Sequence, residues 1–371
     1  MDKKLVGRFC DLVRIPSPSG KERDVVLHLQ KLLKKEGISS RIDGSAMKAE
    51  SNTGNLIAKI GSGGPTILFT AHTDTVEDGK RMVNPIVKNG RISSDGKTIL
   101  GSDDKAGVAA LVEALIELNK MKNTPTVIAA FVTREETGFG GVRNLDIKEK
   151  VDYAFDVDGS EPPGQFINQA LGCFCFEVQI TGKEAHSARN PDKGASAIKA
   201  AGVIVSKLKF GRDSHGGTLN VGMISGGKVF NVVAGSATLS VEVRGYDQKT
   251  VDKKVAEVRS ASDAACKLTG CSYRIVEVKG MKAPAFVTTD KKIIELARKS
   301  TAACGLRFSL LKLLASVQAS ELSSQGYTVL GLCKGGQGPH STKESISVKE
   351  LEQTKALIME IVKQAKVSRK P

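Results

Sequence analysis

The strongest structural signal in the chain is in residues 66–74, which read TILFTAHTD. This is a short apolar run that ends in a histidine, His72, and an aspartate, Asp74. Further short apolar runs, each followed by polar or glycine-rich sequence, occupy residues 55–60, 126–133, 153–157 and 328–333. Runs that are apolar on both faces are typical of buried strands in a largely parallel sheet. Together the runs predict the strands of one such sheet.

Helical patterns lie beside these runs. Apolar residues recur at helical spacing over residues 23–36, 105–121 and 291–304. Strands that alternate with helices predict an α/β domain with a doubly wound, mostly parallel sheet and helices on both of its faces. We expect this main domain to be made from residues 1–173 and 283–371.

Residues 174–282 follow a different pattern. Half-exposed strands, in which polar and apolar residues alternate, are separated by two helical stretches in the order β-α-β-β-α-β. This is the order of the ferredoxin-like α+β unit, which folds as an open-faced sandwich. The sequence therefore predicts two domains, with the smaller one inserted into the chain of the larger one.

The composition of the chain argues against several classes of protein. Lysine and arginine number 55 against 40 aspartates and glutamates, but there is no tryptophan and there are only 4 tyrosines to stack on bases. No apolar stretch approaches the roughly 20 residues that a membrane span needs. The 7 cysteines are scattered and do not form the pattern of a disulfide framework. We expect a soluble, cytoplasmic protein whose partners include neither nucleic acid nor a membrane.

Imidazole and carboxylate groups follow the predicted parallel strands. Ligands of an open α/β sheet bind beyond the carboxyl ends of its strands, so these groups should meet in one cleft. They belong to His72, Asp74, Asp103, Asp104, Glu135, Glu136, Asp158 and His340. So many carboxylates would repel one another, and divalent cations would relieve the repulsion. Imidazole and carboxylate ligands suit Zn²⁺, Co²⁺ or Mn²⁺, and the set suffices for two ions that share one carboxylate and hold a hydrolytic hydroxide.

Two local spacings indicate how this cleft could work. Asp74 lies two residues after His72, on the same side of an extended segment, and can hold the second nitrogen of the imidazole. Glu135 and Glu136 are adjacent and point in different directions, so that one can bind a metal while the other transfers protons. Each spacing alone is common in loops and at helix ends. Only their combination at strand ends indicates metal-dependent hydrolysis.

Four motifs follow one another along the chain: residues 71–76 (AHTDTV), 101–107 (GSDDKAG), 135–138 (EETG) and 340–344 (HSTKE). Together they resemble the M20 metallopeptidases, and within that family the peptidase T group of tripeptide aminopeptidases. The resemblance implies two Zn²⁺ ions per chain. One would be bound by His72, Asp103 and Asp158. The other would be bound by Asp103, Glu136 and His340, so that Asp103 bridges the two ions.

The same resemblance implies roles for the remaining residues of the cleft. Glu135 would be the general base and acid, Asp74 the partner of His72, and the Asp103–Asp104 peptide would be cis. The main domain would then be catalytic. The implied activity is that of an exopeptidase, which hydrolyses an amide bond in short peptides by means of a metal-bridged hydroxide.

The inserted domain resembles the lid and dimerisation domain of this family. Three of its residues match positions that contact the substrate: His186, Asn231 and Arg244. The first of these often acts across a dimer, and an arginine can hold a carboxylate with two parallel hydrogen bonds. The resemblance therefore implies a homodimer that forms through the inserted domain.

One segment departs from the family pattern. Residues 314–320 read LASVQAS, where the family usually has a glycine-rich run followed by serine or threonine and aspartate. That loop contacts the substrate, so the departure leaves the substrate open. The alternatives are a carboxypeptidase, a dipeptidase or an N-acyl amino acid amidohydrolase with the same metal centre. A non-catalytic homologue that binds peptides is a further alternative.

Overall fold

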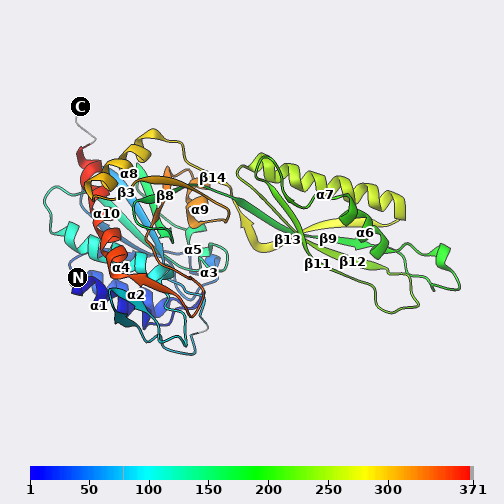
Figure 1. Ribbon diagram of the computed structural model, residues 1–371, viewed down its shortest axis with the longest axis horizontal. Coiled ribbons are helices and arrows are strands. Elements are labelled where there is room, and N and C mark those ends of the chain that lie inside the picture. Colours follow the sequence, from blue (N-terminus) through cyan, green and yellow to red (C-terminus); the bar gives the residue numbers. More distant parts are fainter. Residues whose placement is uncertain (78, 368–371) are drawn as a thin grey trace. The chain divides into compact units, whose positions relative to one another are not determined.

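The chain folds into two units, each with a hydrophobic core of its own. The computed structural model describes residues 1–77 and 79–367 (Figure 1). The main unit contains Met1–Gln169, Thr288–Leu313 and the chain from Val317 onward. The inserted unit contains Ala170–Val287 together with Leu314–Ser316, and so begins and ends a few residues outside the predicted range of 174–282.

A mixed β-sheet forms the centre of the main unit. Its strands are β1 (Ser39–Ile42), β2 (Leu56–Ile60), β3 (Gly63–His72), β6 (Pro125–Val132), β7 (Tyr153–Gly159), β8 (Gln165–Ala170), β15 (Ser309–Leu313) and β16 (Val329–Cys333). They lie in the order β1-β2-β6-β3-β7-β16-β8, and β15 also pairs with β8. The four central strands, β6, β3, β7 and β16, are parallel to one another. The α/β class predicted from the sequence is thus confirmed.

The direction of one strand differs from the prediction. The sequence predicts a parallel strand over residues 55–60, but β2 runs antiparallel to its neighbour β6. The chain passes from Ile60 at the end of β2 to Gly63 at the start of β3 with almost no connection. A parallel arrangement needs a crossover of about a dozen residues or more. The chain therefore reverses direction, and β6 lies between the two strands.

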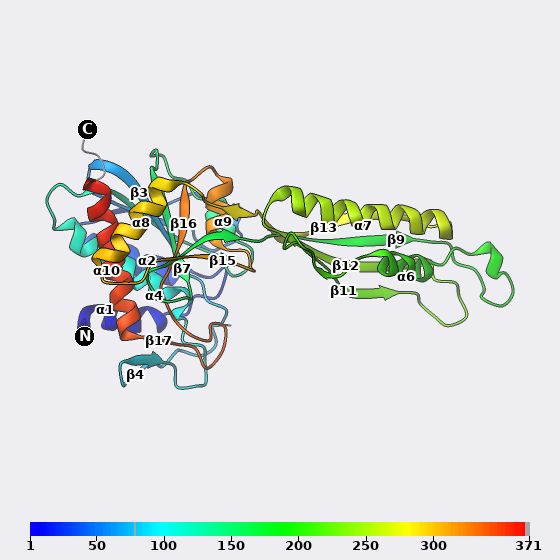
Figure 2. The ribbon, with the colours of Figure 1, turned by 45° about the horizontal axis from the view of Figure 1, so that its top comes forward.

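Helices pack against this sheet and complete the core. The longer ones are α1 (Lys3–Val13), α2 (Arg23–Lys35), α4 (Ser102–Asn119), α8 (Lys291–Ala303) and α10 (Val348–Val367). The shorter ones are α3 (Ala46–Ala49), α5 (Gly140–Arg143) and α9 (Gln318–Ser324). Helix α4 packs against β3 and β7 and against α1 and α10 (Figure 2). Because α4 is buried against so many elements, its first residues are held firmly relative to the ends of these strands.

Smaller features complete the description of the main unit. A separate three-stranded sheet has the order β17-β5-β4, with β4 at Ile86–Lys88, β5 at Arg91–Ser93 and β17 at Ser345–Ser347. The rings of Phe69 and Phe155 stack in the core, with centroids 5.6 Å apart.

Among the described residues of the whole chain, no helix is both long enough and apolar enough to cross a lipid bilayer. All cysteines carry free thiols.

An antiparallel sheet with two helices makes up the inserted unit. Its elements are β9 (Gly172–Thr181), η1 (Pro191–Lys193), α6 (Ala197–Lys207), β10 (Gly211–Arg212), β11 (Thr218–Gly226), β12 (Ser236–Gly245), α7 (Gln248–Thr269), β13 (Ser272–Ala283) and β14 (Phe286–Val287). The sheet has the order β10-β11-β12-β9-β13. Helices α6 and α7 pack against each other and both contact β9 and β12, so they cover the same face (Figure 2). Apart from the short strands β10 and β14, the order of elements is β-α-β-β-α-β.

Candidate metal centre

The predicted metal ligands lie at the carboxyl ends of the central parallel strands. His72 is the last residue of β3, and Asp158 lies near the end of the adjacent strand β7. The other three come from the start of α4 and from the loops that follow β6 and β16: Asp103, Glu136 and His340. This edge is where ligands of an open α/β sheet bind. These five residues are called the candidate metal centre below.

Asp103 lies between the two histidines of the candidate metal centre. Its Oδ2 is 3.3 Å from Nε2 of His340, and that nitrogen is 3.0 Å from Oε1 of Glu136. Its Oδ1 is 3.5 Å from Nε2 of His72, and this second nitrogen is 3.6 Å from Oδ1 of Asp158. The two oxygens of one carboxylate therefore face two different sets of donors. We call these the His340 side (His340, Glu136) and the His72 side (His72, Asp158).

The separations between donor atoms fit divalent metal ions. Two ligands that each lie about 2.1 Å from a tetrahedral Zn²⁺ are about 3.4 Å apart. Three sets of donor atoms in this cleft lie within 4.8 Å of one another: Asp103–Glu136–His340, His72–Asp104–Asp158 and His72–Glu135–Glu136. The set His72–Asp103–Asp158 that the resemblance implies is not among them. Because imidazole nitrogens and carboxylate oxygens make up these sets, they suit Zn²⁺, Co²⁺ or Mn²⁺.

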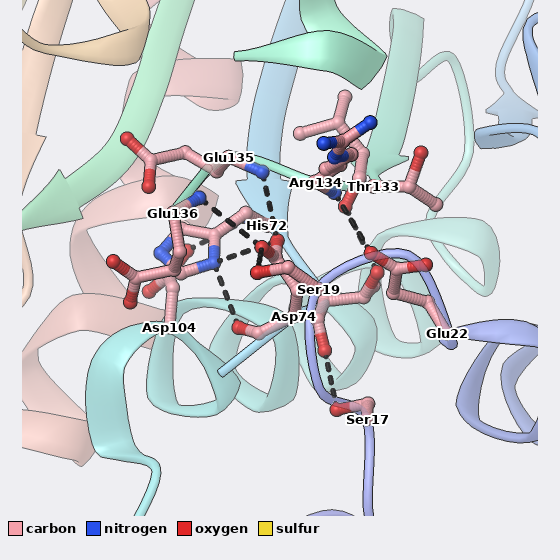
Figure 3. A network of polar contacts seen from close by, with 12 residues as sticks. Ser17, Ser19, Glu22, His72, Asp74, Asp104, Thr133, Arg134, Glu135 and Glu136 are labelled. Atoms are coloured by element: carbon pink, nitrogen blue, oxygen red, sulfur yellow. Dashed lines mark hydrogen bonds and ion pairs between the residues drawn. The ribbon is translucent and has the colours of Figure 1, made fainter. Parts of the chain in front are cut away.

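Asp74 holds both a histidine and the two adjacent glutamates in place. Nδ1 of His72 faces the backbone carbonyl oxygen of Asp74 at 3.0 Å and Oδ1 of its carboxylate at 3.4 Å. The same carboxylate accepts hydrogen bonds from the backbone amides of Glu135 and Glu136, at 2.9 and 3.1 Å (Figure 3). It also accepts one from the hydroxyl of Ser19 at 2.7 Å. Asp74 therefore couples the end of β3 to the loop after β6, which is more than the predicted pairing with His72.

Glu344 holds the start of α4. Its Oε1 accepts hydrogen bonds from the hydroxyl of Ser102 at 2.7 Å and from the amide of Asp103 at 2.9 Å. Its Oε2 accepts two more, from the amides of Leu100 and Gly101. The sequence motif around His340 includes Glu344 but assigns it no role. In the structure it fixes the backbone of the aspartate that faces both histidines.

Asp104 lies beneath the candidate metal centre, and its peptide bond with Asp103 is cis. Its side chain is buried, and burial raises its pKa well above the usual range. Its two oxygens accept hydrogen bonds from the backbone amides of His72 and Gly107, each at 3.2 Å. Asp104 thus positions the backbone at the end of β3.

The electrostatics of this cleft follow from burial and from its excess of carboxylates. Burial raises the pKa of Glu135 well above its usual range and that of Glu136 to about 7. The hydrogen bond with Asp103 raises the pKa of His340 to about 9. Burial opposes protonation of His72, but Asp158, Asp103 and Asp74 outweigh it and raise its pKa well above the usual value. The cleft therefore attracts positive charge, which divalent ions would supply.

Glu135 differs from the other acidic groups of the cleft because its carboxylate is unrestrained. Its backbone amide is held by Asp74. Within residues 1–77 and 79–367, however, no hydrogen bond or ion pair holds its side-chain oxygens. A partly buried carboxylate with a raised pKa and no such partner can accept a proton and release it again.

Comparison with known proteins agrees with this geometry. A sequence profile of peptidase family M20/M25/M40 matches residues 68–364 of the chain. The chain belongs to this family. One relative is a protein of Bacillus subtilis (strain 168) that bears the name "Uncharacterized protein YqjE". It is 31% identical to this chain over 371 residues, which cover 98% of this chain and 99% of that protein.

Two crystal structures of M20 relatives superimpose on nearly the whole chain. Aminopeptidase PepT from Bacillus cereus ATCC 10987 has a TM-score of 0.90 and 30% sequence identity, and the match covers 98% of both chains. A tripeptidase from Staphylococcus aureus has a TM-score of 0.90 and 27% identity, with 99% of both chains covered. The predicted relationship to the peptidase T group is confirmed, and so is the class of metallopeptidase.

Lys334 contacts the candidate metal centre of this M20 peptidase, and sequence reasoning missed it. It follows β16 directly and its side chain is only 2% exposed. Its Nζ lies 3.3 Å from Oδ1 of Asp103 and 3.6 Å from both Oδ1 of Asp104 and Oδ1 of Asp158. Burial would lower the pKa of Lys334, but these carboxylates raise it well above the usual value. A lysine at the end of an apolar run gives no sign in the sequence that it will meet three distant aspartates.

Of the segment 314–320 that departs from the family pattern, the last three residues form the start of helix α9. Gln318 is fully buried, and its Nε2 donates to Oδ1 of Asp156 at 2.5 Å. The hydroxyl of Thr70 donates to the same oxygen at 2.7 Å. Oε1 of Gln318 and the hydroxyl of Ser320 are buried without a hydrogen-bond partner. The segment therefore carries polar groups next to β7 that the structure leaves unsatisfied.

The loop that carries His340 has a backbone that glycines determine. Gly335, Gly336 and Gly338 all have φ in the left-handed region, at 84°, 109° and 61°. A Cβ at Gly335 would lie within 2.8–2.9 Å of the Glu350 side chain. Two backbone hydrogen bonds between Gln337 and Ser345 close the loop. His340 itself has φ of 61°.

The three residues predicted to contact the substrate lie in two places within the inserted unit. His186 forms an isolated bridge with Val232, and the carbonyl of Asn231 accepts a hydrogen bond from the next amide, that of Ser187, at 3.0 Å. Arg244 lies near the far end of β12, where Nη2 bonds Oε1 of Glu242 at 2.8 Å. The structure thus brings His186 and Asn231 together, and Arg244 lies apart from them.

Proposed function

We propose that this M20 peptidase is a two-metal exopeptidase that hydrolyses an amide bond in short peptides, with Zn²⁺ as the metal and Co²⁺ or Mn²⁺ as substitutes. The observation that carries the proposal is the position of Asp103. Its two carboxylate oxygens face two histidines that lie on different elements, and each histidine has a further carboxylate beside it. One aspartate could bridge two ions in this way.

The residues of the chain would divide the work of hydrolysis. Divalent ions held by the candidate metal centre would lower the pKa of a bound water and polarise the scissile carbonyl. Glu135 would accept the proton of the attacking water and then transfer it to the leaving amine. Asp74 would keep Glu135 and His72 at a fixed separation, because its oxygens hold the amide of one and its backbone faces the ring of the other.

A tripeptide aminopeptidase is the specific activity that we propose. The solved relatives with the highest similarity described above are an aminopeptidase PepT and a tripeptidase. Gln318 is the feature that keeps the alternatives open, because it lies in the segment where the family usually has a substrate-contacting loop. A carboxypeptidase, a dipeptidase or an N-acyl amino acid amidohydrolase would use the same metal centre on a different substrate.

A homodimer through the inserted unit is part of this proposal. Arg244 lies eight residues along β12 from Ser236, a distance of about 26 Å in a strand. His186 and Asn231 lie beyond the Ser236 end, so one short peptide could contact Arg244 and these two residues only if they came from different chains. The part of β11 beyond its short pairing with β10 supports such an assembly, because it carries Met223 and Ile224, which are 68% and 60% exposed.

The test is an assay with free tripeptides beside the same tripeptides acylated at the amino terminus. An aminopeptidase should cleave only the free peptides, and its products should lack the first residue. Cleavage of the acylated peptides alone would favour the amidohydrolase, and release of the last residue would favour the carboxypeptidase. Turnover of neither set, with Zn²⁺, Co²⁺ or Mn²⁺ added, would contradict the proposal.

Glu135→Gln is the matched control for this assay. The variant removes the proton-transferring group and keeps the ligands of both sides. Turnover should fall by about 10²–10⁴-fold while the metal content stays the same. A variant that retains most of the wild-type rate would remove Glu135 from the proposed role.

A further inference from the structure

The two sides of the candidate metal centre carry unequal charge, because Lys334 lies on only one of them. Oδ1 of Asp103 is 3.5 Å from Nε2 of His72 and 3.3 Å from Nζ of Lys334. Oδ1 of Asp158 is 3.6 Å from each of the same two nitrogens. The ammonium group of Lys334 therefore faces the same two carboxylate oxygens that a metal ion beside His72 would need.

The His340 side uses different oxygens. There the donors are Oδ2 of Asp103 and Oε1 of Glu136, at 3.3 and 3.0 Å from Nε2 of His340. Among the described residues, no ion pair joins Lys334 to either of these oxygens. A metal ion on this side would meet three donor atoms and no ammonium group in contact with them.

The side chain of Lys334 is fixed in this position. Its Nζ also donates to the backbone carbonyl of Asp158 at 3.0 Å, and its side chain is 2% exposed. Its backbone is held as well, because its amide donates to the carbonyl of Gly159 at 2.7 Å and its carbonyl accepts from the hydroxyl of Thr354 at 3.1 Å. If the ammonium group left these oxygens, several hydrogen bonds would break. Its charge would also have to be buried at another place.

We infer that Lys334 makes the metal centre asymmetric. The position formed by Asp103, Glu136 and His340 binds a divalent ion tightly. At the position formed by His72, Asp103 and Asp158, the ammonium of Lys334 competes with the ion for the same oxygens. This second position fills only at a much higher metal concentration. The inference rests on the proposed metal centre, and it specifies how the ions are distributed in it.

The experiment is a titration of metal-free protein with Zn²⁺ alone, in the presence of a competing chelator and without peptide. The wild-type chain should retain about one ion after desalting, and the second should bind at least about 100-fold more weakly. Lys334→Met removes the charge and keeps an unbranched side chain of similar length. This variant should retain about two ions per chain.

Three further variants identify the positions and control for the loss of a buried lysine. Lys334→Arg keeps the charge and should keep the unequal binding. His340→Ala should abolish the tight step, whereas His72→Ala should leave it. Lys254→Met is the matched control, because Lys254 is a 5% exposed lysine in the inserted unit whose Nζ lies 2.9 Å from Asp213. It should bind metal as the wild type does.

Two results would overturn the inference. One is a wild-type chain that binds two Zn²⁺ ions with equal affinity, which can be seen even if Lys334→Met does not fold. The other is a folded Lys334→Met chain whose second step is no tighter than that of the wild type. Because the measurement follows metal binding, it is independent of catalysis. Unequal binding without cleavage of any peptide would leave this inference standing and contradict the proposed function alone.

Discussion

His72 and His340 carry the same side chain and face the same aspartate, but their surroundings are opposite. The side chain of His72 is 1% exposed, at the end of a strand in the middle of the sheet. That of His340 is 52% exposed, in a loop. Both rings face carboxylate oxygens through Nε2. The comparison shows that the geometry of one side is set by the core, whereas that of the other side depends on a loop.

The two sides also differ in what neutralises their carboxylates. On the His72 side a buried lysine is present, and Asp74 fixes the other nitrogen of the imidazole. On the His340 side the described contacts of the ring are with Asp103 and Glu136 alone. The His72 side is thus complete in the folded chain, and the His340 side has more to gain from a metal ion.

The largest effect should come from Asp103→Asn, which removes the carboxylate that both sides share. Neither set of donors would then be complete, so the variant should retain no tightly bound ion. The catalytic efficiency kcat/KM should fall by about 10³-fold or more, because a metal ion contributes several kcal/mol to the transition state. Metal analysis and peptide hydrolysis measure the two effects.

Asp11→Asn is a suitable control for this variant, because the Asp11 side chain is 61% exposed and, among the described residues, pairs only with Arg14 three residues away. It should leave both quantities unchanged. Tight metal binding in Asp103→Asn would mean that the two sides do not share a ligand.

Replacing each histidine by alanine should affect the free energy of unfolding differently on the two sides. In metal-free protein, His72→Ala should lower the free energy of unfolding by about 2–3 kcal/mol, because it empties a buried site and removes one polar partner from each of the carboxylates around it. His340→Ala should change it by less than about 0.5 kcal/mol, as is usual for exposed positions. Urea unfolding in the presence of a chelator checks this. Equal losses would show that the exposed loop is as much a part of the core as β3 is.

A smaller effect is expected from Asp74→Asn. The variant keeps the shape of the side chain, but its amide group would replace one of the two oxygens that accept the amides of Glu135 and Glu136. Catalytic efficiency should fall by about 10–100-fold, as is typical when a residue that hydrogen-bonds to a metal ligand is changed. Asp74 faces the ring of His72, but on the His340 side its only contact among the described residues is with the backbone amide of Glu136, so the tight step of the metal titration should not move. A loss of that step would contradict the separation of the two sides.

The smallest effect should come from Ser19→Ala, which removes one hydrogen bond to Asp74 at 2.7 Å. The carboxylate keeps its bonds to two backbone amides. The free energy of unfolding should fall by about 1 kcal/mol, and peptide hydrolysis should change only a few-fold. A loss of hydrolysis as large as that of Asp74→Asn would mean that the hydroxyl has a direct role.

The sequence predicted those parts of the fold and site that depend on local pattern. Apolar runs with polar ends located the central strands, and His72 and Asp158 lie at their carboxyl ends as parallel strands require. The direction of β2 could not be read in this way, because an apolar run looks the same in either direction. It was settled by the short connection to β3.

The residues that the sequence did not reveal are those whose role comes from distant partners. Lys334 is buried against Asp103 and Asp158, which are far from it in the chain, but its neighbours in the sequence do not distinguish it from a surface lysine. Glu344 likewise acts on backbone amides more than 240 positions earlier in the chain. Such roles depend on the packed structure and have no spacing of their own.

The glycines before His340 have a consequence for how this protein can vary. Gly335, Gly336 and Gly338 have no chemical group to offer a substrate or an ion, but their left-handed φ angles set the path of the chain to the exposed histidine. Other residues rarely adopt such angles without strain. Selection for activity in a randomised library should therefore preserve these three positions almost as strictly as the imidazole itself. In this loop, residues that lack a side chain determine where a predicted metal ligand lies.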